Sequence, residues 1–386
     1  MVLRQVGSWL LATVVSCVFA ATPCGADQPI VLGALYNSTG QQAGLDVPSS
    51  KGARLAVDQA NANGGVLDRP IVLSIQDGQS KPAVVKAKTA ELLASSPAPV
   101  ALFGLSDTDL VLAAAPTAAR DKRVFLTSGA TSPLLPAEVP EWLFLACFGD
   151  NVQAAAAAEW AYNDHNARTA LVLYDSSHEY TRLLQKYFGE RFTQLGGKVS
   201  GKRSFISATL EQSLEKLPEV EMVFLSAEVP ADIQKAVRAI RAAGLDCPIV
   251  GGDSFDSAGL WEKDAVVNDI YYTTHAYLGN DNKNERVVEF RKAFAQAYPD
   301  TEPDAFAALG YDTARLLLLA IQESKTAAPD DIRQALSGIR KFEGVTGTLS
   351  YPKDSRIPTK AVSLIEVDGG KLRLVREVLP KGVPAP

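Results

Sequence analysis

Short apolar runs alternate with amphipathic stretches along almost the whole chain after Ile30. This alternation is typical of βαβ units, in which buried strands form a parallel sheet and helices cover its faces. In the first half of the chain, strands are expected at Ile30–Leu35, Ile71–Gln76, Val100–Phe103 and Val124–Thr127. A helix is expected over Ser49–Asn63, with Ser50 as its N-cap and the pair Gly64-Gly65 at its end. The first half therefore predicts an α/β unit.

A second series of the same kind follows Asp150. Its expected helices are Val152–Asn166, Tyr180–Leu195 and Ala231–Ala243, and its expected strands are Ala170–Tyr174, Met222–Leu225 and Pro248–Val250. The two series share an order of elements but no residue-by-residue match, so the repeat is architectural. With 386 residues, of which 47% are hydrophobic, the chain is long enough for two domains. We therefore expect an α/β fold of two lobes with parallel sheets and a cleft between them.

The last third of the chain follows neither series in order. It contains an expected strand at Ile270–Thr274, helices at Glu285–Tyr298, Asp304–Ser324 and Pro329–Ile339, a turn at Gly344–Gly347, and a hairpin of Lys360–Asp368 with Lys371–Val378. The first two of these helices are expected to pack on the first lobe. Such crossings predict a multi-strand hinge, with one lobe at residues 27–147 and 276–358 and the other at 148–275 and 359–386.

The N-terminal segment has the pattern of a signal peptide over residues 1–26. Arg4 provides a basic start, an apolar core follows from Trp9 to Ala21, and Cys24-Gly25-Ala26 offers a small-residue cleavage site. A membrane anchor is the alternative, but the apolar run is too short to span ~30 Å of hydrocarbon. We therefore expect an exported protein whose mature chain begins at Asp27.

Composition and motifs narrow the classes of function. The net charge of −6, without dense Lys or Arg runs, argues against a nucleic-acid or anionic-membrane partner. The chain has no G-x-S-x-G elbow, no phosphate-binding loop and no G-x-G-x-x-G after a strand, so neither an enzyme nor a cofactor is expected. His178 follows Asp175, Ser176 and Ser177, but residues so close in sequence rarely converge into a catalytic triad.

Cysteine and histidine usage predicts neither a disulfide framework nor a metal site. Removal of the signal peptide leaves Cys147 and Cys247, which are too few for a framework and are expected as buried thiols. The three histidines, His165, His178 and His275, are widely spaced and lie near no cysteine pair. A zinc site is therefore not expected.

Small polar residues gather where the strands end. In the first lobe, Thr108 follows one strand, ahead of a helix expected to start at Asp109, and Gly129-Ala130-Thr131 follows the next. Ligands of parallel sheets bind beyond the carboxyl ends of strands, and a helix N-terminus favours an anion. These residues therefore predict a seat for a carboxylate. The alternatives are that Thr108 only caps its helix and that Thr131 only shapes the turn before Pro133.

The strand ends of the second lobe carry carboxylates instead. Glu228 and Asp253 each follow an expected strand. The two sides together suit a zwitterion, with its carboxylate held by the first lobe and its ammonium by Asp253 or Glu228. The alternatives are a capping role for Asp253 and a solvated loop charge at Glu228.

Four stretches of the chain resemble the Leu/Ile/Val-binding protein family, the type I periplasmic solute-binding proteins of ABC importers. They are GARLAVDQANANGGVLDRPI (Gly52–Ile71), FLTSGATS (Phe125–Ser132), VRAIRAAGLDCPIVGGDSF (Val237–Phe255) and ALGYDTARLLLLAI (Ala308–Ile321). The resemblance extends from Asp27 nearly to the end of the chain. It implies two Rossmann-like lobes that close on a ligand.

The resemblance also implies roles for individual residues. Thr108 and the run Gly129-Ala130-Thr131 match positions that hold the carboxylate of an amino acid ligand. Asp253 matches the acid that neutralises the α-ammonium, where aliphatic amino-acid binders have glutamate. Tyr180 matches a ring of the second lobe that lies over the ligand, and Phe306 matches an apolar pocket residue.

Two positions depart from the family pattern. Leu45 stands where the usual pocket aromatic precedes the first helix, and Glu228 stands where tyrosine is common. Both departures argue against a Leu/Ile/Val ligand. A second carboxylate beside Asp253 would cost several kcal/mol if it were buried unpaired. Glu228 therefore either meets a cationic group of the ligand or stays in contact with water.

The sequence thus predicts a periplasmic, monomeric binding protein that captures an amino acid or related amine and presents it to the permease subunits of an ABC transporter. Two alternatives stay open within binding proteins: an aromatic carboxylate, or a short amide or urea, as the ligand. An effector-sensing subunit of the same fold is a further alternative.

Overall fold

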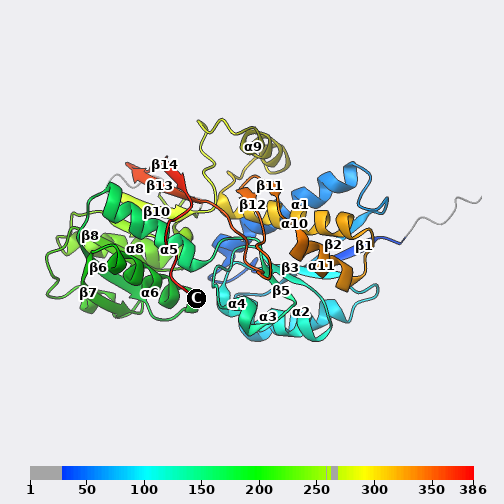
Figure 1. Ribbon diagram of the computed structural model, residues 1–386, viewed down its shortest axis with the longest axis horizontal. Helices are drawn as coiled ribbons and strands as arrows, with labels where there is room; N and C mark the ends of the chain where they lie inside the picture. The colour runs from blue at the N-terminus through cyan, green and yellow to red at the C-terminus, as the bar shows by residue number, and fades with distance from the viewer. Residues whose placement is uncertain (1–27, 258, 262–267) are drawn as a thin grey trace, which may run out of the picture.

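The computed structural model describes residues 28–257, 259–261 and 268–386 (Figure 1). The predicted signal peptide and its cleavage site lie outside these residues. None of the helices in the described ranges is long and apolar enough to cross a membrane.

Five parallel strands form the sheet of the first lobe, in the order β2-β1-β3-β4-β5. The strands are β1 (Ile30–Tyr36), β2 (Ile71–Asp77), β3 (Ala101–Gly104), β4 (Phe125–Thr127) and β5 (Leu143–Leu145). The helices between them are α1 (Ala43–Ala62), α2 (Pro82–Leu93), α3 (Thr108–Arg120) and α4 (Leu135–Glu138). Neighbouring residues of a strand point to opposite faces, so Leu102 and Phe103 of β3 lie in separate apolar clusters.

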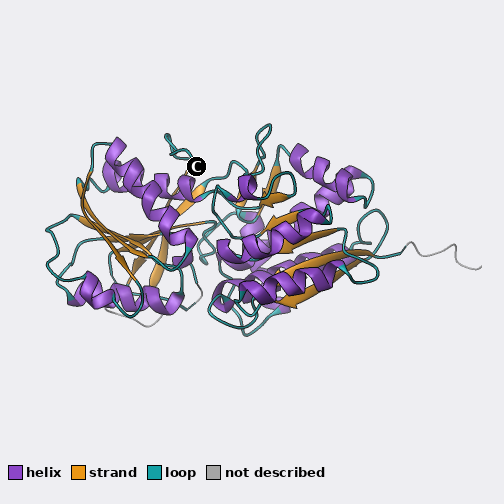
Figure 2. Ribbon diagram, turned by 90° about the horizontal axis from the view of Figure 1, so that it is seen from below, coloured by secondary structure: helices purple, strands orange, loops and turns teal. Residues whose placement is uncertain are grey.

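Seven strands form the sheet of the second lobe, in the order β14-β13-β10-β9-β8-β6-β7. The strands are β6 (Thr169–Asp175), β7 (Lys198–Phe205), β8 (Met222–Ser226), β9 (Ile249–Gly251), β10 (Ile270–Thr274), β13 (Val362–Asp368) and β14 (Lys371–Val378). The helices are α5 (Asp150–Glu159), its π-helical continuation η1 (Trp160–Asp164), α6 (Glu179–Gln194), α7 (Leu210–Ser213), α8 (Pro230–Ala242) and the 3₁₀ turn η2 (Asp253–Phe255). Helices lie on both faces of each sheet (Figure 2), which confirms the predicted α/β class.

The chain passes between the lobes after β5, after β10 and after β12. The segment between the second and third crossings contains α9 (Glu285–Ala297), α10 (Ala305–Ser324), α11 (Pro329–Gly338) and the hairpin of β11 (Phe342–Gly344) with β12 (Gly347–Leu349). As predicted, α10 packs on the first lobe, where Leu317 and Ile321 join the apolar cluster of β1. The residue bounds expected for the lobes stay a prediction.

Two glycines allow α1 and α10 to pack very closely. A Cβ atom at Gly52 would lie 1.9 Å from the carbonyl oxygen of Ala307, and one at Gly310 would lie 1.9 Å from that of Ser49. No side chain fits at either position, because real Cβ atoms do not approach backbone so closely. Both glycines belong to stretches that carry the family resemblance, which therefore reflects this helix contact.

The first helix differs from the prediction. It begins at Ala43 and continues through Pro48, whereas the predicted start was Ser49. Ser50 does not cap it, since its hydroxyl donates to the carbonyl of Val47 at 3.0 Å. Proline is disfavoured inside helices because it lacks an N–H and crowds the preceding turn. That rule placed the predicted start too late.

Four strands were not predicted. β11 and β12 are short strands on either side of the expected turn at Gly344–Gly347. β5 has only three residues within a longer apolar run, and β7 is a mostly polar edge strand. Pairing with β4 and β6, respectively, places them in the sheets. The two cysteines are free, as expected, although Cys247 is only half-buried.

Candidate functional site

A small cavity of about 220 Å³ of empty space lies between the two lobes. The first lobe lines it with Leu45, Ser106, Gly129, Thr131 and Phe306, and the second lobe lines it with Tyr180, Glu228, Asp253 and Ser254. Seven of the nine predicted site residues therefore meet at one cavity. The other two, Thr108 and Ala130, are buried nearby without lining it.

The loop after β3 is folded back by two residues in the left-handed region. Gly104 has φ of 118° and Leu105 has φ of 56°. The N–H of Leu105 donates to Leu35 at 3.0 Å, and its carbonyl accepts from the Thr127 hydroxyl at 3.0 Å and from the Gly129 N–H at 3.2 Å. The ends of β1, β3 and β4 are thereby joined, which fixes this wall of the cavity.

Asp107, not Thr108, is the N-cap of α3. Its Oδ1 accepts from the N–H of Leu110 at 2.8 Å, and the helix starts at Thr108 rather than at the predicted Asp109. The Thr108 hydroxyl is buried and has no hydrogen-bond partner among the described residues. The predicted carboxylate seat at this helix end thus already contains a carboxylate of the protein.

The turn after β4 is held by its own side chains. The Ala130 N–H donates to the Thr127 hydroxyl at 3.1 Å, and Ala130 itself packs in the apolar cluster beside β4. The Thr131 carbonyl accepts from the N–H of the buried Asp150 at 2.7 Å, and burial raises the pKa of the Asp150 carboxyl well above its usual range. Thr131 therefore faces both the cavity and a buried acid.

Leu45 and Phe306 form the apolar part of the cavity wall. Leu45 lies in the first turn of α1, not ahead of the helix as expected. Phe306 lies in the first turn of α10, which Asp304 caps by accepting from the N–H of Ala307 at 2.8 Å. Both side chains are buried, so this wall suits an aliphatic part of a ligand.

Asp253 is held by donors from its own lobe. Its Oδ1 accepts from Gln153 Nε2 at 2.7 Å and from the Tyr180 hydroxyl at 2.8 Å, and its Oδ2 lies 2.9 Å from His275 Nε2. Burial lowers the pKa of His275 to about 4, so the imidazole is neutral at pH 7 and donates through Nε2. Tyr180 therefore positions the acid in addition to lining the cavity.

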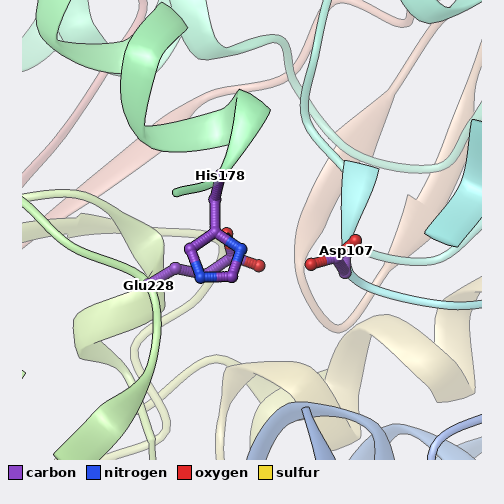
Figure 3. A group of neighbouring side chains, drawn as sticks. All are labelled: Asp107, His178 and Glu228. Carbon is purple, nitrogen blue, oxygen red and sulfur yellow. The ribbon is translucent and has the colours of Figure 1, made fainter. Parts of the chain in front are cut away.

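Glu228 is surrounded differently, because most of its partners are acidic or come from the first lobe. Its Oε1 accepts from Gln42 Nε2 at 2.8 Å, and the same nitrogen donates to Asp107 Oδ2 at 2.8 Å. His178 Nδ1 lies 3.5 Å from Glu228 Oε2. Burial, and then the neighbouring Asp107, raise the pKa of Glu228 well above its usual range. Figure 3 shows Asp107, His178 and Glu228 pointing toward one another from separate segments.

Sequence reasoning missed the residues that support these two acids. Gln42, Gln153 and His275 carry no motif, and each reaches its acid only through the fold. The position of Asp107 could have been predicted, because aspartate directly ahead of a helix is a strong N-cap. The strand end and the family resemblance both point to the neighbouring Thr108 instead.

A larger cavity, of about 1100 Å³ of empty space, lies beside the crossing segments. Its lining includes Trp261, Tyr277 and Arg291. None of the predicted site residues lines it, and it adjoins in sequence the residues that the structure does not describe. The predicted site residues that line a cavity therefore gather at the smaller one.

Residues 29–371 match the family described as periplasmic binding protein. The Leu/Ile/Val-binding protein BraC3 of Rhizobium johnstonii is 22% identical over 375 residues, which cover 94% of this chain and 98% of that protein. The leucine binding protein LivK of Thermotoga maritima superposes with a TM-score of 0.81 at 24% identity, covering 91% of this chain and 99% of that one. A solute binding protein of an ABC transporter from R. palustris, in complex with benzoate, gives 0.79 at 20% identity, covering 92% and 98%.

These likenesses extend over nearly the whole chain, and the two structures share its two-lobed α/β fold. The relatives are solute-binding proteins, which agrees with the scarcity of enzyme motifs. The chain belongs to the periplasmic binding protein family, within its Leu/Ile/Val-binding type, and it is a solute-binding protein rather than an enzyme.

Proposed function

We propose that this protein is the periplasmic solute-binding subunit of an ABC importer and captures an amino acid or related amine in the cavity between its lobes. One observation carries the proposal. The described residues that line the cavity include two carboxylates, Asp253 and Glu228, and neither Lys nor Arg. A buried carboxylate needs a cationic or hydrogen-bonding partner, and an ammonium group supplies both.

The cavity is nearly closed in this arrangement of the lobes. The space that the centre of a water molecule could occupy is about 10 Å³, which is room for about one water. A ligand of the proposed class would therefore enter while the lobes lie further apart. Leu45 and Phe306 offer apolar contacts for a short aliphatic part.

The carboxylate end of an amino acid ligand would meet the first lobe. The Thr131 hydroxyl lines the cavity there, and Thr108 has a free buried hydroxyl close by. The N–H groups in the first turn of α3 that Asp107 does not cap add further donors. Asp107 itself would repel a carboxylate, which favours an amine with a weak or distant anionic group.

Other ligand classes receive less support. BraC3 carries the name of a Leu/Ile/Val-binding protein, but here Glu228 brings a second carboxylate to the cavity. The R. palustris structure contains benzoate, whose carboxylate would face Asp253 and Glu228 without a Lys or Arg among the described lining residues. An amine-bearing ligand would pair with the two carboxylates instead of being repelled by them or leaving Glu228 without a partner.

Transport as a monomer through permease subunits, with export to the periplasm, completes the proposal. The family relationship and the predicted signal peptide support it. Permease and ATPase genes beside this gene would favour import, whereas a regulator gene would favour an effector-sensing subunit.

A thermal-shift screen in buffer containing EDTA tests the ligand class. The panel contains amino acids, simple amines, aromatic acids, short amides and urea. A ligand present at 100 times its Kd adds about 2.7 kcal/mol to the free energy of unfolding. We expect this stabilisation from an amine-bearing compound. If aromatic acids or urea raise the melting temperature while every amine fails, the proposed ligand class is wrong.

A further inference from the structure

We infer that Asp107, His178 and Glu228 form a site for one divalent transition-metal ion of the zinc type, which joins the two lobes beside the cavity. Each residue offers one ligand atom, and the three atoms lie within 4.8 Å of one another. Asp107 belongs to the first lobe, and His178 and Glu228 belong to the second (Figure 3). Glu228 also lines the cavity, so a bound metal ion and an amine ligand would share this carboxylate.

The geometry suits a zinc-type ion. Metal bonds of about 2.1 Å in a tetrahedral site place neighbouring ligand atoms about 3.4 Å apart. The Nδ1 atom of His178 and the Oε2 atom of Glu228 are 3.5 Å apart. The ligand atom of Asp107 lies within 4.8 Å of both, and it comes from the opposite lobe.

Burial provides the second line of support. Asp107 is 4% exposed and Glu228 is 3% exposed. The Oε2 atom of Glu228 has no hydrogen-bond partner among the described residues and lies 3.5 Å from His178 Nδ1. A buried carboxylate oxygen without a donor is costly, and a cation in the cluster would remove that cost.

The charges of the cluster favour a divalent ion over the imidazolium alone. Two buried acids, Asp107 and Glu228, face each other in the cluster. The ion pairs of the described residues include none between either carboxylate and Lys or Arg. Asp109 adds a further negative charge nearby, since its Oδ2 accepts from the N–H of Glu179 at 3.3 Å. A divalent ion bound by neutral His178 balances Asp107 and Glu228 completely.

Gln42 accounts for how the cluster can exist without a metal. Its Nε2 donates to both Asp107 and Glu228, while its Oε1 has no partner in the described part of the chain. The amide therefore separates the two carboxylates in the present arrangement. Rotation of this amide would turn its oxygen toward a bound cation and supply a fourth ligand.

The ligand types identify the class of metal. One imidazole and two carboxylates suit zinc and neighbouring transition metals, whereas magnesium and calcium prefer oxygen ligands alone. Histidine and cysteine spacing predicted no zinc site, because both carboxylates come from distant parts of the chain. The fold brings them to His178.

Isothermal titration of the EDTA-treated, dialysed protein with ZnCl₂, without any organic ligand, tests the inference. We expect one ion per chain, with much weaker binding of MgCl₂. His178→Gln and Asp107→Asn should each weaken zinc binding at least tenfold. Asparagine remains a good N-cap, so Asp107→Asn preserves the start of α3. His165→Gln is the matched control, because His165 is exposed and lies outside the cluster.

X-ray scattering supplies a second measurement. Zinc should reduce the radius of gyration of the wild-type protein, because the ion joins the lobes, and should leave that of His178→Gln unchanged. The melting temperature of each variant in EDTA shows whether it folds. If one variant does not fold, Glu228→Gln replaces it.

Two results would overturn the inference. One is zinc binding that is absent, or equally strong in wild type and in the cluster variants. The other is an organic amine whose affinity in EDTA depends on His178 while zinc does not bind, which would make the cluster part of the organic ligand site. Because the amine screen contains EDTA, failure of the zinc site and failure of the proposed function give different results.

Discussion

Asp253 and Glu228 are two buried carboxylates of the same lobe that line the same cavity, yet they are held in opposite ways. Asp253 receives hydrogen bonds from Gln153, Tyr180 and His275, all of the second lobe. Glu228 receives its hydrogen bond from Gln42 of the first lobe and faces Asp107 there. The surroundings of Asp253 are therefore complete within one lobe, whereas those of Glu228 exist only where the lobes meet.

This difference suggests separate roles for the two acids. A carboxylate whose donors are built into one lobe is oriented before any ligand arrives, and such preorganisation favours affinity. A carboxylate whose partners come from the other lobe changes its surroundings as the lobes approach. Asp253 is thus suited to recognise the ligand, and Glu228 is suited to respond to closure.

The largest expected effect concerns Asp256, a buried acid that follows Asp253 in the same loop. Its Oδ2 accepts from the Thr274 hydroxyl at 2.6 Å, and burial raises its pKa to about 7. The folded state therefore holds this proton more tightly than the unfolded state, whose pKa is 3.8. The contribution of Asp256 to the free energy of unfolding therefore falls as the pH rises from about 4 to about 7, and it does not change further above that pH.

Asp256→Asn should remove this loss. Each pKa unit is worth about 1.4 kcal/mol, so the variant should gain stability on the order of 4 kcal/mol at most, above pH 7. Urea unfolding of both proteins at pH 4.5 and pH 8 measures the effect. Equal stabilities at pH 8 would show that Asp256 does not titrate in this range. A higher free energy of unfolding in Asp256→Asn at pH 8 would assign this pH dependence to Asp256 rather than to Asp253 or Glu228.

The next effect tests recognition by Asp253. Asp253→Asn should weaken an amine-bearing ligand by about 1.5–3 kcal/mol, the range for a hydrogen bond to a charged group. His275 can adapt by changing its tautomer, which keeps the fold intact. Calorimetric titration with the best amine of the screen gives the affinity, and the melting temperature without ligand is the control. Unchanged affinity would remove Asp253 from the site.

Much of the architecture could be predicted from the sequence because local pattern determines it. β10 and α9 were placed almost to the residue, since apolar periodicity and polar boundaries agree there. The start of α1 was predicted too late, because a proline such as Pro48 is disfavoured inside a helix. The packing of Gly52 against α10 stabilises the helix in spite of this proline. Tertiary contacts outweighed propensity at that position.

The residues of the candidate site also differ in whether local sequence pattern determines their position. Residues at the strand ends, such as Thr131 and Asp253, could be found because topology places the ends of parallel strands together. Gln42 and His178 could not, because they meet Glu228 only through contacts between distant segments. The sequence position of Asp107 indicated a cap, but nothing local indicated that it faces an acid from the other lobe.

The smallest effects compare the two kinds of support directly. Tyr180→Phe removes a donor to Asp253 within one lobe and should lower the stability of the protein without ligand by about 1.5 kcal/mol. Gln42→Leu removes a donor that bridges the lobes. It should leave that stability nearly unchanged and weaken the amine ligand by about 0.5–1.5 kcal/mol, because closure then leaves Asp107 and Glu228 without their shared donor.

Urea unfolding without ligand and calorimetric titration with it, in EDTA, measure both variants. The distinction depends on where each donor lies, since a contact within a lobe is present whether or not the lobes meet. If Gln42→Leu lowers the stability of the protein without ligand as much as Tyr180→Phe does, the lobes already meet in the absence of ligand. Glu228 would then be as preorganised as Asp253, and a response to closure would no longer distinguish the two acids.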